Sequence, residues 1–255
     1  MNPLRALTRS LGRPAVIAHR GASAAAPENS LAALRLAREL GADGVEFDVQ
    51  RCRTGELVVF HDRTLARCTG ALGTLVETPF EALRELSLDR VDSGRAGARI
   101  PTLEEFLAAV PADLFLNLEV KIDDLVEAPL GRACVEALAR VGRDRRAIVS
   151  SFHPAALLHA LAADRSVARA ALVEASADWR LRLALGMSSA PAAVHPEHPL
   201  VDPRRVAGWH RLGLRVATWT VDEPGEATRC LDAGVDAIIT NRPDLVRPIA
   251  ERFRC

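Results

Sequence analysis

The sequence predicts an α/β fold, namely a TIM-type (β/α)8 barrel with a small insertion after the second strand. Short apolar runs alternate with amphipathic helical patterns along almost the whole chain, and they form eight strand–helix units with short connections. The length of 255 residues is usual for one such barrel, so we expect a single domain over residues 1–255. No G-x-G-x-x-G pattern follows a predicted strand, which disfavours an open doubly wound sheet.

The predicted strands are the short apolar runs, many of them rich in β-branched residues. They cover residues 15–18, 45–49, 57–60, 114–120, 147–150, 170–173, 192–194, 215–221 and 237–240. The run at 57–60 follows a Thr54-Gly55 turn and is expected to continue the layer that begins at 45–49.

Helices are predicted between these strands from amphipathic spacing and from capping residues. Asn29 or Ser30 is expected to cap the first helix, which closes at Gly41. Thr102 begins a Thr-x-x-Glu capping box, and Asp202 caps a helix that has a proline in its first turn. The predicted helices cover residues 31–40, 103–110, 125–141, 154–162, 179–185 and 226–231, and two more begin at 203 and 243.

Residues 63–100 interrupt this alternation, because they exceed what a connection between a strand and its helix needs. The stretch holds turn signals at Thr69-Gly70, Gly73-Thr74 and Asp92-Ser93-Gly94, and a second predicted capping box at 78–81. It is not strongly apolar. A connection of this length in a compact domain predicts a functional loop or a small insertion over the site.

Composition limits the possible partners and the compartment. The formal net charge is zero and no long basic run occurs, so we expect no nucleic-acid partner. No segment is long and apolar enough to span a bilayer, so we expect no stable membrane insertion. Five scattered cysteines without C-x-x-C spacing are typical of reduced thiols and predict a cytoplasmic protein without structural zinc. The oligomeric state stays open.

Two of the predicted strands carry carboxylates near their ends, and each of these carboxylates lies two residues from another charged side chain. Strand side chains alternate between faces, so Glu46 and Asp48 share one face, and Glu119 shares a face with Lys121. The parallel neighbours of a barrel would bring the three carboxylates together, where they would repel without a cation. All-oxygen ligand sets favour hard divalent ions, which predicts Mg²⁺ or Ca²⁺ at this point. Separate pairing of each carboxylate with an arginine is the alternative.

Two histidines also end strand-like runs, and imidazoles can act as general base and general acid near neutral pH. We predict these roles for His19 and His61. Arg20, which precedes a glycine, is expected to contact a phosphate. Glu28 either orients Arg20 or is a carboxylate favoured in the first turn of a helix. Asp62 either holds His61 or caps a turn.

The 33 basic residues include one lysine, and it stands at a strand end. Its compact ammonium differs from a guanidinium fork, so we predict a phosphate contact for Lys121, with chance survival on the surface as the alternative. Trp219 either walls the pocket against substrate carbon or fills the barrel. His153 is more plausibly structural. The four remaining histidines, at 159, 195, 198 and 210, are expected at the surface or in loops.

Taken together, these segments resemble the glycerophosphodiester phosphodiesterase family. The similarity runs in order along nearly the whole chain, through His19-Arg20-Gly21-Ala22-Ser23, Pro27-Glu28-Asn29-Ser30, Val45-Glu46-Phe47-Asp48-Val49, Val58-Val59-Phe60-His61-Asp62, Ile100-Pro101-Thr102-Leu103-Glu104, Leu118-Glu119-Val120-Lys121, Trp219-Thr220-Val221 and Gly234-Val235-Asp236-Ala237-Ile238-Ile239-Thr240. It implies a TIM-type barrel with a small insertion, a divalent metal on the three carboxylates, acid–base work by the two histidines, and phosphate contacts from Arg20 and Lys121.

The chain departs from the family pattern at three positions outside the predicted metal and histidine set. Cys68 stands where threonine is common, His153 where Asp or Asn is more frequent, and Asn241 where an aspartate often follows the last strand. These departures bear on substrate preference.

The resulting hypothesis is hydrolysis of a glycerophosphodiester to glycerol 3-phosphate and an alcohol. A lysophospholipase D-like activity on mono-acyl lipids is the nearest alternative, although residues 63–100 lack the apolar character that it would favour. A Schiff-base aldolase using Lys121 belongs to a different class. A catalytically silent barrel that binds phosphorylated metabolites would be expected to lack part of the predicted set.

Overall fold

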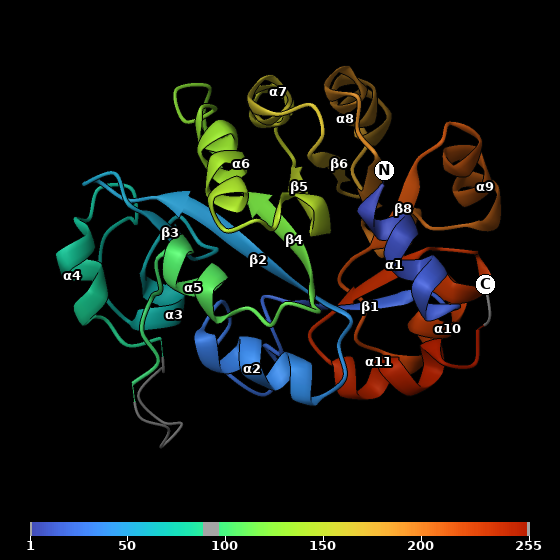
Figure 1. Cartoon of the computed structure of the whole chain (residues 1–255), viewed down its shortest axis with the longest axis horizontal. Helices are drawn as coiled ribbons and strands as arrows, with labels where there is room; N and C mark the ends of the chain where they lie inside the picture. Colours follow the sequence, from blue (N-terminus) through green and yellow to red (C-terminus); the bar gives the residue numbers. More distant parts are fainter. Residues whose placement is uncertain (1, 89–96, 254–255) are drawn as a thin grey trace.

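The computed structural model of the chain describes residues 2–88 and 97–253. Eight parallel strands of this part form the barrel, and β1 pairs with both β2 and β9, which closes the cylinder (Figure 1). The strands are β1 (Ala15–His19), β2 (Gly44–Arg51), β4 (Phe115–Val120), β5 (Ala147–Ser151), β6 (Ala168–Val173), β7 (Ala193–Pro196), β8 (Arg215–Thr218) and β9 (Ala237–Thr240). The predicted (β/α)8 barrel is confirmed.

Most helices surround the barrel and cover its outer face, while the first, at residues 3–11, packs against the barrel interior and two short ones lie in the stretch after β2 (Figure 1). They are α1 (Pro3–Leu11), α2 (Leu31–Glu39), α3 (Ala66–Thr69), α4 (Phe80–Glu85), α5 (Leu103–Ala109), α6 (Leu130–Arg140), α7 (Pro154–Ala163), α8 (Trp179–Gly186), α9 (Pro203–Arg211), α10 (Pro224–Asp232) and α11 (Pro243–Ala250). The helix expected from residue 125 begins only at Leu130. The Asp124 side chain accepts from the backbone of Val126 and Glu127, and so forms a turn in place of the first helical turn.

Small apolar side chains fill the interior of the barrel. Six alanines from five strands pack there with Ile17, Phe115, Ile148 and Ile239, and the fully buried Leu4 of α1 joins the same cluster. Helix α1 was not predicted; Asn2 caps it by accepting from two backbone amides. This apolar packing at one end of the barrel leaves the polar side chains at the carboxyl ends of the strands.

Three of the predicted caps, at Ser30, Thr102 and Asp202, are confirmed and one is wrong. Ser30 accepts from the Ala33 amide and caps α2, and Thr102 forms the complete capping box of α5. The capping box expected at Thr78 does not form, because its hydroxyl donates to the Thr74 carbonyl oxygen. Helix α4 therefore begins after Pro79 without a side-chain cap.

The stretch after β2 forms its own small apolar cluster beside the barrel. Strand β3 (Leu57–Val59) pairs antiparallel with β2, so the expected run at 57–60 extends the sheet but lies outside the closed cylinder. Val58, Phe60, Leu75 and Leu83 are buried together there, with α3 and α4 around them (Figure 1). The turn expected at 92–94 lies outside the described residues. No helix in 2–88 or 97–253 is long and apolar enough to cross a bilayer.

Candidate active site

The register of the strands determines which of the predicted site residues lie side by side in the barrel. His19 of β1 lies beside Glu46 of β2, and Glu46 lies beside Asn117 of β4. Two residues further along, Asp48 of β2 lies beside Glu119 of β4. Because alternate strand residues share a face, all five belong to the inward set of the barrel at its carboxyl end. Active sites of this fold lie at that end.

The three predicted carboxylates converge. One oxygen atom from each of Glu46, Asp48 and Glu119 lies within 4.8 Å of the other two, and all three residues are buried. Among the described residues, Glu46 Oε1 has no hydrogen-bond partner, while Glu119 Oε1 and Asp48 Oδ1 contact the Lys121 ammonium. A buried oxygen atom without a partner is expensive unless a cation or proton satisfies it. The donor set therefore fits a hard divalent ion.

The pKa shifts of the three carboxyl groups also favour a bound cation or proton. Burial raises the pKa of Glu46 well above its usual range, and the neighbouring Asp48 and Glu119 raise it further. Burial also raises the pKa of Glu119, although Lys121 opposes this. For Asp48, burial is outweighed by Lys121 and then Arg20, so its pKa is lowered. Without a cation, the trio favours the uptake of a proton.

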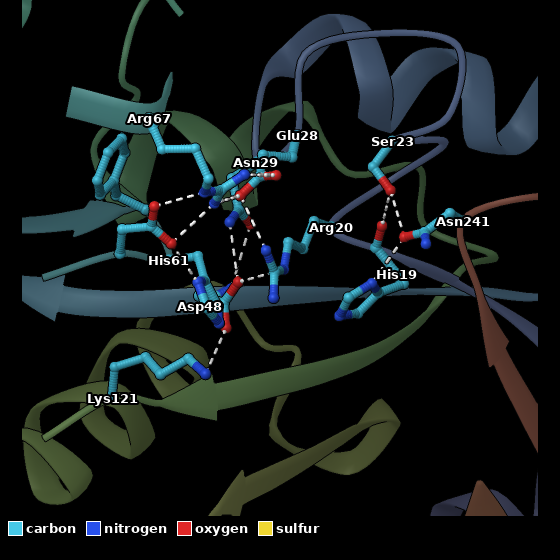
Figure 2. A network of polar contacts seen from close by, with 12 residues as sticks. His19, Arg20, Ser23, Glu28, Asn29, Asp48, His61, Arg67, Lys121 and Asn241 are labelled. Atoms are coloured by element: carbon cyan, nitrogen blue, oxygen red, sulfur yellow. Dashed lines mark hydrogen bonds and ion pairs between the residues drawn. The ribbon is translucent and has the colours of Figure 1, made fainter. Parts of the chain in front are cut away.

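Two cations flank the trio. Lys121 Nζ lies 2.6 Å from Glu119 Oε1. It also lies 3.4 Å from Asp48 Oδ1, and Arg20 Nε lies 3.2 Å from Asp48 Oδ2 (Figure 2). The backbone amide of Arg20 donates to Glu46 Oε2 at 2.9 Å. Arg20 has a φ of +54°, and its conformation turns the chain sharply at the end of β1. The predicted alternative of separate guanidinium pairs for each carboxylate is not what forms.

The backbone at Gly21, directly after Arg20, admits no larger residue. Gly21 has a φ of +79°, and a Cβ atom there would lie 2.6 Å from the backbone of Ala33 in α2. Close packing of β1 against α2, together with the left-handed backbone, therefore requires glycine.

The two histidines stand on either side of the carboxylates. His19 Nε2 lies 4.0 Å from Glu46 Oε2; burial and the nearby Arg20 lower the pKa of His19 to about 4. His61 Nδ1 lies 2.6 Å from Asp62 Oδ1. Burial lowers the pKa of His61 as well, although Asp48 opposes this. Both shifts favour the neutral imidazole while the site holds neither substrate nor metal ion.

Three further residues, which were not predicted to belong to the site, position its side chains through hydrogen bonds. Asn29 was considered only as a helix cap, yet its amide donates to Asp48 Oδ2 at 2.9 Å and so positions that carboxylate. Arg67 donates to both Glu28 and Asp62, which joins the carboxylates behind Arg20 and His61 (Figure 2). The Gln50 amide donates to the carbonyl oxygens of Phe60 and of the next two residues and holds the chain at His61.

A cavity of about 240 Å³ lies over the site. Seven of the ten predicted site residues line it, namely His19, Arg20, Glu46, His61, Glu119, Lys121 and Trp219; Asp48 lies behind Arg20 and Lys121, and Glu28 and Asp62 contact Arg20 and His61. Trp219 faces the cavity and packs edge-on against Phe152, with ring centroids 5.5 Å apart. Phe152 and Glu174 also line it and were not predicted; a strand-end position is the one signal that could have identified them.

One histidine is not where the sequence predicted. His195 was expected at the surface or in a loop, but β7 continues to Pro196 and His195 is 1% exposed. It shares a face with Ala193, which belongs to the barrel interior, and neither ring nitrogen has a partner. Burial lowers its pKa to about 3.

Glu28, His61 and Asp62 form a second candidate metal group. Arg67 forms ion pairs with both of its carboxylates, so these are already neutralised by a guanidinium.

A barrel with two imidazoles, two cations and three converging carboxylates at its carboxyl end is typical of a phosphate hydrolase whose carboxylates can hold a divalent ion, and comparison with known proteins identifies the family. The model of the glycerophosphoryl diester phosphodiesterase family matches residues 19–245. A glycerophosphodiester phosphodiesterase of Caldanaerobacter subterraneus subsp. tengcongensis is 34% identical over 236 residues, covering 90% of this chain and 94% of that protein. Glycerophosphodiester phosphodiesterase 1 of Bos taurus is 29% identical, covering 82% of this chain and 72% of that protein.

The solved structures agree. A phosphodiesterase of Oleispira antarctica, in complex with its product sn-glycerol-3-phosphate, has a TM-score of 0.83 and 31% identity, covering 96% of this chain and 99% of that one. The chain belongs to the glycerophosphoryl diester phosphodiesterase family, and it is an enzyme of the phosphoric diester hydrolase class.

Proposed function

We propose that this enzyme hydrolyses glycerophosphodiesters to glycerol 3-phosphate and an alcohol with a divalent ion, Mg²⁺ or Ca²⁺, held by Glu46, Asp48 and Glu119. The observation that carries the metal proposal is the convergence of three buried carboxylates, with one oxygen atom of each within 4.8 Å of the other two and with Glu46 Oε1 left without a hydrogen-bond partner among the described residues. The product bound to the Oleispira antarctica relative supports the substrate class. When bound, the ion supplies Lewis-acid polarisation of a phosphoryl oxygen and a fixed point that orients the substrate.

The cations of the site bind and neutralise the phosphate. Arg20 presents a guanidinium fork and Lys121 an ammonium to the same cavity. Charge that develops on the phosphoryl oxygens meets both groups in a partly buried pocket, where such interactions are strong. Glu28 donates no proton; it accepts from Arg20 Nη1 at 2.9 Å and fixes the orientation of the guanidinium.

The two imidazoles move the protons. One accepts a proton from the attacking oxygen as it bonds to phosphorus, and the other donates a proton to the alcohol oxygen as its bond to phosphorus breaks. The attacking oxygen belongs either to water or to a neighbouring substrate hydroxyl, which would form a cyclic phosphate first. Asp62 accepts a hydrogen bond from His61 and orients its ring, and Trp219 forms the apolar wall against substrate carbon.

The alternatives fit the site less well. A Schiff-base aldolase needs a neutral lysine, but the carboxylates of Glu119 and Asp48 outweigh burial and raise the pKa of Lys121 above its usual value. A lysophospholipase D-like activity needs room for an acyl chain, whereas the cavity is about 240 Å³ and nine polar or charged residues line it. The complete set of predicted groups disfavours a silent barrel.

The remaining proposals concern organisation and compartment. We place residues 63–100 as a small insertion within one barrel domain, since the described part of the stretch packs around its own apolar cluster. We propose a cytoplasmic location, which the buried free thiols of Cys52, Cys68, Cys134 and Cys230 support.

A turnover panel tests the function. Purified enzyme is assayed with glycerophosphocholine, -ethanolamine, -glycerol and -inositol in Mg²⁺, in Ca²⁺ and in EDTA, and released glycerol 3-phosphate is measured. We expect turnover of at least one diester with a divalent ion and loss of turnover in EDTA. Full turnover in EDTA would remove the metal from the proposal, and absence of any glycerol 3-phosphate would remove the substrate class.

A further inference from the structure

Asn241 occupies a central position in the hydrogen bonds behind His19. It follows β9, and its Oδ1 lies 2.7 Å from His19 Nδ1 and 2.6 Å from Ser23 Oγ (Figure 2). On its other side, Asn241 Nδ2 donates to Asp222 Oδ2 at 2.6 Å. His19 ends β1 and Ser23 follows it, Asn241 follows β9, and Asp222 lies in the loop after β8. In the sequence, Asn241 stands out as a departure from the family pattern that bears on substrate preference, with no catalytic role assigned.

We propose that Asn241, anchored by Asp222, is a positioning residue that holds His19 in the tautomer protonated at Nδ1, with the Nε2 lone pair turned toward the carboxylates and the cavity. The inference rests on the proposed function for its catalytic meaning. The orientation of the Asn241 amide and the tautomer of His19 follow from hydrogen-bond chemistry alone.

Asp222 determines which way the amide of Asn241 points. Three donors surround the Asp222 carboxylate: Thr240 Oγ1 at 2.9 Å, the Asn241 backbone amide at 2.7 Å, and Asn241 Nδ2 at 2.6 Å. A carboxylate only accepts hydrogen bonds. The opposite amide orientation would place Asn241 Oδ1 against Asp222 Oδ2 with no proton between them, so the nitrogen faces Asp222 and the oxygen faces His19.

The tautomer of His19 follows from that orientation. Asn241 Oδ1 carries no proton, so His19 Nδ1 must donate in the 2.7 Å contact. In the neutral ring, the lone pair then lies on Nε2, the atom 4.0 Å from Glu46 Oε2. An imidazole held in this state is ready to accept a proton at Nε2 and is not able to donate one from it. His61 Nδ1 contacts the carboxylate of Asp62, which also only accepts, so the neutral ring of His61 has the same tautomer, while the negative charge of Asp62 in addition favours a second proton on this ring.

The first experiment measures the tautomer directly. Protein labelled with ¹⁵N-histidine is examined by two-dimensional NMR in the metal-free and substrate-free state, and the His19 signals are assigned by their absence in His19→Gln. We expect the Nδ1-protonated tautomer in the wild type. Asn241→Leu, which keeps the approximate shape and removes both hydrogen bonds, should show a mixture or the Nε2-protonated form.

The second experiment separates positioning from a merely structural role. Asn241→Leu should lower kcat by about 10-fold or more while KM changes by less than about 3-fold, because a mis-set tautomer affects the proton transfer more than binding. Asn241→Asp alone places two carboxylates together at a 2.6 Å contact and should also lower kcat. The double exchange Asp222→Asn with Asn241→Asp restores a donor opposite an acceptor and should recover both the Nδ1-protonated tautomer and most of kcat.

Ser23→Ala is the control. The Ser23 hydroxyl proton is shared between the His19 carbonyl oxygen and Asn241 Oδ1, so it does not set the amide orientation. This variant should keep the tautomer. Wild-type tautomer and kcat in Asn241→Leu, or no recovery in the double exchange although it folds, would overturn the proposal. A wild type without phosphodiesterase activity would instead refute the proposed function, while the NMR result would still decide the tautomer.

Discussion

Residue-level contacts in the pocket join each reactive group to a second group that fixes its position. His19 contacts Asn241, Arg20 contacts Glu28, and His61 contacts Asp62 (Figure 2). A reactive side chain held at two points loses little rotational freedom in the reaction, which is how binding geometry contributes to rate. Changes at single residues should therefore affect turnover more than stability.

Removal of either imidazole should abolish most of the activity. His19→Ala or His61→Ala should lower kcat by at least about 100-fold, the low end of what acid–base catalysis contributes, and should leave the far-ultraviolet circular dichroism spectrum unchanged. His159→Ala on α7, outside the cavity, is the matched control and should retain wild-type kcat. Near-normal turnover in one of the first two variants would exclude that histidine from the mechanism.

The buried His195 should make the enzyme sensitive to mild acid. Its folded pKa of about 3 lies below the usual 6.5, so between these values the unfolded chain takes up a proton that the folded chain does not. The free energy of unfolding therefore decreases as pH falls below 6.5, and by pH 5 this one group should lower it by about 2 kcal/mol.

The measurement is urea unfolding of the wild type and of His195→Leu at pH 7 and pH 5. The loss of unfolding free energy between the two pH values should be smaller in the variant by about 2 kcal/mol. His159→Gln, a half-buried histidine on α7, should behave like the wild type. Equal losses in wild type and His195→Leu would show that His195 is not the group responsible.

At the scale of elements, close helix contacts depend on glycine. Gly131 in α6 faces α7, and a Cβ atom there would overlap the carbonyl oxygen of Ala156. By contrast, the nearest atom to a Cβ atom at Gly208 in α9 would be the end of the Arg211 side chain at 3.9 Å. The same substitution should therefore have opposite effects at the two sites.

Gly131→Ala should lower the unfolding free energy by about 1–3 kcal/mol, because the two helices must separate to admit a methyl group. Gly208→Ala should raise it by about 0.5–1 kcal/mol, since alanine loses less entropy in a helix. Both values come from denaturant unfolding monitored by circular dichroism. A loss of similar size at both positions would mean that helix packing in this region is not the cause.

For the molecule as a whole, the carboxylate trio should couple folding to metal binding. Mg²⁺ or Ca²⁺ that binds the folded chain alone should raise its stability by about 2.7 kcal/mol at 100 times the dissociation constant. The midpoint of thermal unfolding is the measurement, with and without the ion. Asp48→Asn should remove the increase, and Asp113→Asn, a surface carboxylate that pairs with Arg38, should keep it.

The increase should also depend on pH. Burial and mutual repulsion raise the pKa of Glu46 and Glu119, so at acidic pH the ion must displace protons from the site. The rise in the unfolding midpoint should therefore be larger at pH 8 than at pH 5. A pH-independent rise would indicate that the ion binds elsewhere.

Much of the architecture was predictable because its causes are local. The alternation of apolar strands and amphipathic helices, and the caps at Ser30, Thr102 and Asp202, depend on residues that are near one another in the chain. The strand-end histidines and carboxylates were recognisable for the same reason. Errors arose where a side chain found another partner, as Thr78 did, or where a strand continued past its apolar run, as β7 did to include His195.

The sequence by itself determined the succession of strands and helices, and the chemical types of the groups at the strand ends, because both are written in local spacing. Only the tertiary structure decided which of these groups meet. Asn241 lies 222 residues from His19, and Arg67 lies 39 residues from Glu28, yet each pair is in hydrogen-bond contact. Barrel closure and strand register bring such residues together, and they depend on the packing of the whole chain.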